Sequence, residues 1–118
     1  MTTASLVKIL KQDVSYDEEL KNSFHKESKK VLKKLADKLG LKKGEYDILS
    51  NKGGIAGSGE ISLHTDKLYI QIWQGFNHNE MLYRTCKSRK DYTGGTNQYI
   101  HVQKLLDDEF VNRLLSLS

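Results

Sequence analysis

The segment between Leu20 and Leu39 is amphipathic at a helical period, and this pattern constrains the fold more than any other feature of the chain. One set of its apolar residues recurs at helical spacing: Leu20, Phe24, Val31, Leu35 and Leu39. At about 100° per residue, they cover about 100° of the helix surface. The opposite side carries Lys26, Lys29, Lys30 and Lys33. Because such a helix must bury its apolar side, we expect the rest of the chain to supply a packing surface.

Signals at both ends delimit this helix. Ser15 and Glu18 match the spacing of a capping box, in which the serine side chain bonds free N–H groups of the first helical turn. Gly40 is typical of a helix C-terminus. A shorter helix is expected before it, over residues 4–12, with Thr3 as its N-cap. The helical part is therefore predicted to span residues 1–43.

Residues 45–86 carry the strand signals. Leu68, Ile70 and Ile72 alternate with Tyr69, Gln71 and Trp73, which is the period of a strand with one buried face. Further strands are predicted over 45–49, around 61–64 and over 81–86. The connections between them are short, and short connections require antiparallel pairing. The prediction is an antiparallel sheet of three to four strands.

The last third is predicted to begin with a polar, basic loop over 87–99 and to end with a helix over 102–117. The apolar side of this helix carries Val102, Leu106, Phe110, Leu114 and Leu117. The expected architecture is a single α+β domain over residues 1–118. It has N-terminal helices, the antiparallel sheet, and a C-terminal helix packed on one face.

Several classes of protein are not expected. No apolar stretch approaches the roughly 18 residues of a membrane span. Lys8 and Lys11 interrupt the apolar residues near the N-terminus, so no signal peptide is predicted. Cys86 is the only cysteine, which excludes a disulfide framework. We expect a cytoplasmic protein without a membrane partner.

Catalytic and cofactor motifs are not recognisable either. The glycine-rich stretch 53–59 ends in Gly59-Glu60, where a phosphate-binding loop would need a lysine and a hydroxyl. Cys86 lies beside basic residues that favour a thiolate, but no catalytic signature surrounds it. The four histidines lack the spacing of metal ligands. We expect no catalytic residue, cofactor or metal, and an enzyme without a recognisable motif is the third hypothesis.

The charge distribution points to an anionic partner. Nineteen Lys and Arg stand against fifteen Asp and Glu, and nine of the lysines fall in residues 21–43 with only two acids. A second basic segment runs from Arg84 to Lys90. Lysines neutralise phosphates, Arg holds them bidentately, and tyrosines stack on unpaired bases. The candidate binding residues are Lys26, Lys29, Lys30, Lys33, Arg84, Lys87, Arg89, Lys90, Tyr92 and Tyr99. The pair Gly94-Gly95 is expected to let the backbone approach a ligand.

A resemblance to a small uncharacterised family of bacterial and mobile-element proteins rests on one segment. In this chain it reads Tyr83-Arg84-Thr85-Cys86, two further residues, then Arg89-Lys90-Asp91-Tyr92-Thr93-Gly94-Gly95. The resemblance covers about residues 82–97 and extends to the strands over 58–69. The family has no assigned activity, so the resemblance implies no catalytic residue.

The function predicted from these observations is a small non-enzymatic protein that contacts nucleic acid or a nucleoprotein through two basic patches. The alternative is a phage- or plasmid-type anti-defence inhibitor that binds and blocks a host protein. An exposed apolar patch around Trp73 and Phe76 would favour that alternative. The choice between DNA, RNA and protein stays open, as do the oligomeric state and whether the two basic patches share one surface.

Overall fold

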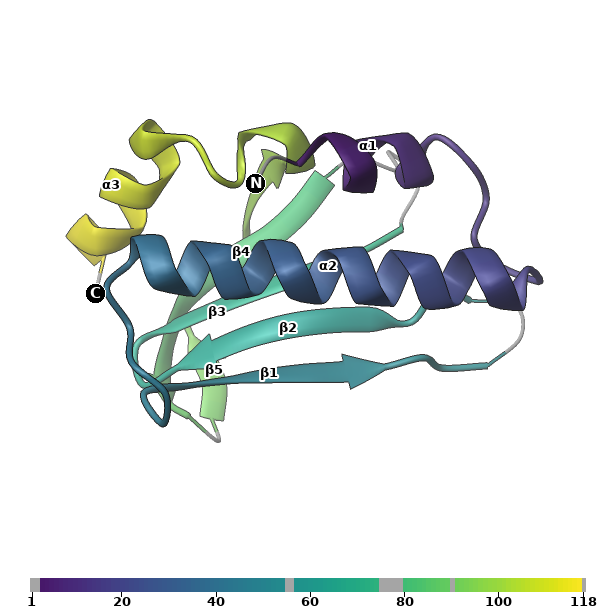
Figure 1. Ribbon diagram of the computed structural model, residues 1–118. Helices are drawn as coiled ribbons and strands as arrows, with labels where there is room; N and C mark the ends of the chain where they lie inside the picture. The colour runs from purple at the N-terminus through teal and green to yellow at the C-terminus, as the bar shows by residue number, and fades with distance from the viewer. Residues whose placement is uncertain (1–2, 55–56, 75–79, 90, 118) are drawn as a thin grey trace.

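The structure is a computed structural model that describes residues 3–54, 57–74, 80–89 and 91–117. Its helices are α1 (Ala4–Leu10), α2 (Glu18–Lys38) and α3 (Asp108–Leu117), and a short 3₁₀ helix, η1, spans Val102–Lys104. Its strands are β1 (Tyr46–Asn51), β2 (Glu60–Thr65), β3 (Leu68–Trp73), β4 (Glu80–Ser88), β5 (Asp91–Gly94) and β6 (Gln98–His101). The predicted α+β class is confirmed (Figure 1).

The sheet is wider than the three to four strands predicted. Strands β1 to β4 form an antiparallel meander, and β5 and β6 both pair with the outer edge of β4. β6 pairs with the first half of β4, from Glu80 to Tyr83, and β5 with its end, from Cys86 to Ser88. Within the described residues, the sheet therefore has six strands but is five strands wide. The fifth position was missed because β5 and β6 are short, polar edge strands without alternating apolar residues.

The core lies between the sheet and the helices. Ile61, Ile72 and Met81 occupy matching positions on three neighbouring strands, so their side chains share one face, and all three are fully buried. α2 runs along this face over β1 and β2, to which it adds Phe24 and Leu35 (Figure 1). Burial of each such side chain stabilises the fold by about 1.5–3 kcal/mol.

All described helices pack on that same face of the sheet (Figure 1). Phe110 of α3 meets the ring of Tyr83 edge-on, with 5.1 Å between ring centroids, and Tyr83 points to the helical side. Leu6 and Leu10 of α1 join the same core. Among the described helices, none combines the length and the apolar character needed to cross a membrane.

The start of α2 differs from the prediction. The N-cap is Asp17, whose carboxylate accepts a hydrogen bond from the Leu20 N–H at 3.0 Å, so Ser15 does not cap the helix. The Ser15 backbone N–H and hydroxyl bond the Asp13 carboxylate instead. Tyr16 lies between them with φ 63°, a left-handed conformation that turns the chain into the helix. Both Ser15 and Asp17 suit an N-cap by residue type, and the turn at Tyr16 decides between them.

The C-terminal third also differs from the prediction. The predicted loop over 87–99 contains the end of β4, all of β5 and the start of β6. The predicted helix over 102–117 is divided into η1 and α3. The first hydrogen bond of α3 runs from the Val111 N–H to the Asp107 carbonyl, so α3 starts there as a separate helix. Asp108 and Glu109 then stand in the first turn of α3, where acidic side chains favour a helix N-terminus. The acidic residues 107–109 therefore mark the start of a helix, although the apolar period runs through them without a break.

Candidate functional site

The lysine face of α2, defined as Lys26, Lys29, Lys30 and Lys33, is exposed along its whole length. It lies on the side of the helix away from the buried residues, as the periodicity predicts. The Lys30 ammonium lies 3.5 Å from the Glu27 carboxylate. In the described part of the chain, the other three lysines have no acidic partner. At about 1.5 Å rise per residue, the face extends about 10 Å along the helix axis.

Arg84 lies on the opposite side of the sheet. Its neighbours Tyr83 and Thr85 point toward the helices, so strand alternation turns Arg84 to the other face. There its guanidinium stands over the Tyr69 ring, 5.7 Å from the centroid, and Nη1 donates to Asn97 Oδ1 at 2.9 Å. Arg84 therefore does not share a surface with the lysine face.

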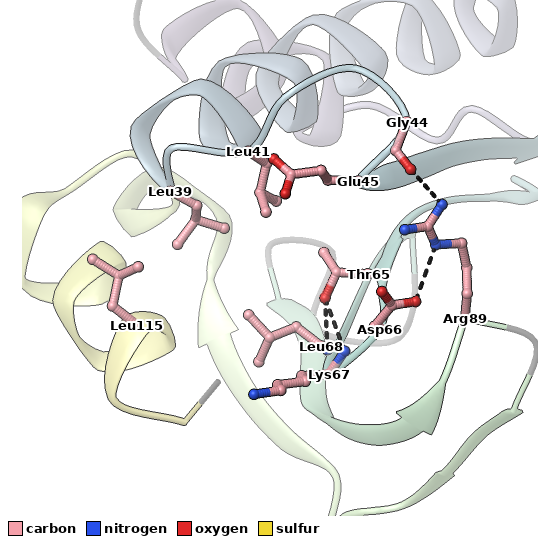
Figure 2. Close-up of a pocket in the computed structure, with 10 residues that line it drawn as sticks. All are labelled: Leu39, Leu41, Gly44, Glu45, Thr65, Asp66, Lys67, Leu68, Arg89 and Leu115. Atoms are coloured by element: carbon pink, nitrogen blue, oxygen red, sulfur yellow. Dashed lines mark hydrogen bonds and ion pairs between the residues drawn. The ribbon is translucent and has the colours of Figure 1, made fainter.

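Arg89 is an internal clamp. Its Nη1 donates to the Gly44 carbonyl at 2.7 Å, and its Nε lies 3.4 Å from the Asp66 carboxylate (Figure 2). The same Nε lies 3.8 Å from the Asp47 carboxylate. These contacts tie the β4–β5 hairpin to the β2–β3 turn and to β1. Lys87 is exposed on the same hairpin. Lys90 lies outside the described residues, as does the side chain of Tyr92.

The glycine pair of this hairpin has a packing role. A Cβ atom on Gly95 would lie 2.5 Å from both the carbonyl oxygen and the hydroxyl oxygen of Thr85. Gly94 has φ 105°, a conformation that favours glycine. Both residues are therefore explained by the close approach of the returning chain to β4, without a ligand.

The face of the sheet turned away from the helices carries aromatic side chains. Tyr69 and Trp73 of β3 are half-buried, and Tyr99 of β6 is 55% exposed. The rings of Trp73 and Tyr99 have centroids 6.3 Å apart. We name these three residues together with Arg84 the aromatic sheet face. Strand alternation already groups Tyr69 with Trp73, and only the pairing of β6 with β4 adds Tyr99 to them.

The glycine-rich stretch is fastened to α2 by polar contacts. His25 Nε2 lies 2.8 Å from the Ser58 carbonyl, which can only accept, so Nε2 carries the proton and Nδ1 accepts from the Ser50 hydroxyl at 2.7 Å. Burial is the main cause that lowers the pKa of His25 below its ordinary value. Lys21 Nζ donates to the Gly54 carbonyl at 2.7 Å, so this lysine is used internally.

Cys86 is not an activated thiol. Burial raises the pKa of Cys86, and its Sγ contacts the Thr65 carbonyl at 3.4 Å. The basic neighbours in the sequence therefore do not produce the thiolate character that they suggested. Within the described ranges, no three His, Cys, Asp or Glu side chains gather as metal ligands.

A groove of about 580 Å³ lies between the C-terminal ends of α2 and α3 and the β2–β3 turn (Figure 2). Leucines line one part of it: Leu39, Leu41, Leu68 and Leu115. Asp66 and Arg89 on its other side are bonded to each other. The groove thus combines an apolar wall with a polar wall that contains the Asp66–Arg89 ion pair.

No protein-family model matches the chain, and searches of curated proteins and of solved structures find no similar protein. The resemblance of residues 82–97 to bacterial and mobile-element proteins therefore stays a prediction.

Proposed function

We propose that this protein is a non-enzymatic binding protein that contacts nucleic acid, alone or in a nucleoprotein, through the lysine face of α2. The observation that carries the proposal is the exposure of Lys26, Lys29 and Lys33 without acidic partners in the described chain. Ammonium groups in this arrangement neutralise phosphates without reading bases. Binding is therefore strongly salt-dependent and independent of sequence.

The second basic patch is not part of this proposal. The Arg84 guanidinium is engaged by Tyr69 and Asn97, and that of Arg89 by two carboxylates and a carbonyl. Tyr99 belongs to the opposite side of the sheet, so base stacking on Tyr99 is not coupled to the lysine face. The proposal therefore uses the lysine face alone, and a contact through Lys87, Lys90 or Tyr92 stays a prediction.

The experiment is fluorescence anisotropy with labelled single-stranded and duplex oligonucleotides across a salt series. One variant combines Lys26→Glu, Lys29→Glu and Lys33→Glu. The control combines Lys42→Glu, Lys43→Glu and Lys104→Glu, which change net charge equally at exposed positions elsewhere. We expect wild-type log K to fall with log salt at a slope of about −3, given about 0.9 per phosphate contact.

In the lysine-face variant we expect affinity at 0.1 M salt to fall about a hundredfold, and in the control less than about fivefold. Thermal unfolding of both variants should match wild type, because exposed lysines contribute little to stability. Equal losses in the two variants would show that only net charge matters. No binding by the wild type at low salt would overturn the proposal.

A second candidate function is favoured by the aromatic sheet face. Trp, Tyr and Arg are the residue types that dominate binding energy at protein interfaces. We infer that, as an inhibitor of the predicted phage or plasmid type, the protein would hold its target there. For this second function we expect a stoichiometric complex with the target protein that survives nuclease treatment and moderate salt. The substitution Tyr99→Ala should abolish the complex. Phe76, predicted to belong to this patch, lies outside the described residues.

A further inference from the structure

The two edges of the sheet are built differently. At one edge, the outer side of β4 is covered by two four-residue strands, β5 and β6. Its pairing with β5 shifts register between Cys86 and Ser88, and β5 ends at Gly94 in a positive-φ conformation. Short and irregular edge strands resist the addition of another strand. This edge is therefore protected against pairing.

The β1 edge has none of these features. β1 pairs with β2 without a register shift at all six of its residues, and it contains no proline and no lysine. Every second residue of such a strand directs its N–H and C=O outward. Asp47 is its only charged residue, and its carboxylate lies 3.8 Å from the Arg89 guanidinium. Leu49 is 59% exposed at the centre of this edge.

We propose that β1 pairs antiparallel with β1 of a second copy of this chain, so that the two sheets become continuous across a two-fold axis. The register centred on Leu49 is self-complementary. It sets Leu49 opposite the partner's Leu49, Asp47 opposite the partner's Asn51, and Ile48 opposite the partner's Ser50. Opposed side chains lie on the same face of the joined sheet, and no like charges meet directly.

The helices permit this arrangement. α2 lies over the β1–β2 pair. With strands about 4.8 Å apart, a helix centred over that pair lies about 5 Å from the two-fold axis. The two α2 helices then run about 10 Å apart, which is the distance of packed helices. The second copy thus completes the layer of helices over the joined sheet.

The lysine face points away from the core, and its stripe of α2 borders the β1 edge of the sheet. Asn22, one turn before Lys26 on the same stripe, accepts a hydrogen bond at 2.7 Å from Lys52, which follows β1 directly. In the dimer, the two lysine faces therefore lie near each other on either side of the two-fold axis. Their mutual repulsion weakens the dimer at low salt, because the screening length is about 10 Å at 0.1 M and about 3 Å at 1 M.

The first test is the mass in solution, by light scattering or sedimentation of the chain without nucleic acid. We expect twice the mass of one chain at micromolar concentration, with a dissociation constant that falls roughly tenfold from 0.1 to 1 M salt. Leu49→Lys should give a monomer with unchanged thermal unfolding, because it opposes two lysines at the axis. Leu115→Lys, the same change at an exposed helix position, should leave the dimer intact.

The second test reads the register directly in a Cys86→Ser background. Directly opposed residues have Cβ atoms about 4.5–5.5 Å apart, close to disulfide geometry. We expect Leu49→Cys to cross-link with itself on mild oxidation. Asp47→Cys should not, because the two copies of residue 47 lie about 13 Å apart along the strands. A monomeric wild type at all salt concentrations, or equal cross-linking of both cysteines, would overturn the dimer and leave the proposed function unaffected.

Discussion

Two segments rich in basic residues have opposite roles in this fold. On α2, Lys26, Lys29 and Lys33 project into solvent, and the described chain brings no acid to them. On the β4–β5 hairpin, Arg89 contacts the Asp47 and Asp66 carboxylates and the Gly44 carbonyl. The planar guanidinium can satisfy several acceptors at once, whereas an ammonium stays strongly hydrated. Basic density in a sequence therefore indicates a binding surface only where the fold supplies no internal acceptors.

The largest effect on the hairpin side of this comparison is expected from Gly95→Ala. The new Cβ would lie 2.5 Å from the Thr85 backbone oxygen, so the chain must shift away from β4. We expect the free energy of unfolding to fall by about 2–4 kcal/mol in urea denaturation. Gly54→Ala is the control, because its Cβ would meet no atom within 4 Å. Equal losses in the two variants would contradict the packing role of Gly95.

A smaller effect, which separates the two basic segments directly, is expected from Arg89→Met. This change removes the clamp, so we expect a loss of about 1–2 kcal/mol of stability in the same assay. Nucleic-acid affinity, measured by anisotropy, should stay within about twofold. The Arg89 charge lies outside the lysine face, and the loss of one such charge changes the affinity little. Lys33→Met should show the reverse, with weaker binding and unchanged stability. If Arg89→Met instead weakens binding and leaves stability unchanged, the clamp assignment is wrong.

The smallest effect is expected from the pH dependence of His25, which fastens the start of α2 to the glycine-rich stretch. Because burial lowers its pKa in the folded state, the unfolded chain takes up the proton first as the pH drops below about 6.5. The free energy of unfolding should therefore fall between pH 7.5 and 5.5. Urea denaturation of His25→Gln should show a shallower decline. An identical decline in that variant would assign the pH dependence to other groups.

The helices and inner strands were predictable because their patterns are local. Burial on one side of α2 follows from its helical period, and the face of β3 that holds Ile70 follows from its alternation. β5 and β6 were not predictable, because a polar edge strand is defined only by its pairing with β4. The N-cap of α2 was wrong for a similar reason, since Ser15 and Asp17 are equivalent until the chain turns at Tyr16.

In the candidate site, too, some features follow from local sequence and others depend on distant residues. The outward direction of the lysine face needs only the helical period. The engagement of Arg89 depends on Gly44, Asp47 and Asp66, and the first of these is 45 residues away in the chain. No local pattern carries that information. Tyr99 is exposed, but its neighbour Trp73 comes from a different strand, so their grouping emerges only from the sheet order.

Hydrogen bonds near the start of the chain bear on the order in which parts of the domain can pack during synthesis. The Thr3 hydroxyl donates to the Gln103 carbonyl at 3.2 Å, and the Gln74 side chain bonds the carbonyl of Gln12 and the N–H of Val14. These partners lie 60 to 100 residues further along the chain, so they are synthesised well after α1. α1 can pack on α2 as soon as α2 has been made, but its bonds to Gln74 and Gln103 can form only later. The segment from Thr3 to Val14 is therefore fastened to the rest of the domain at a late step of folding.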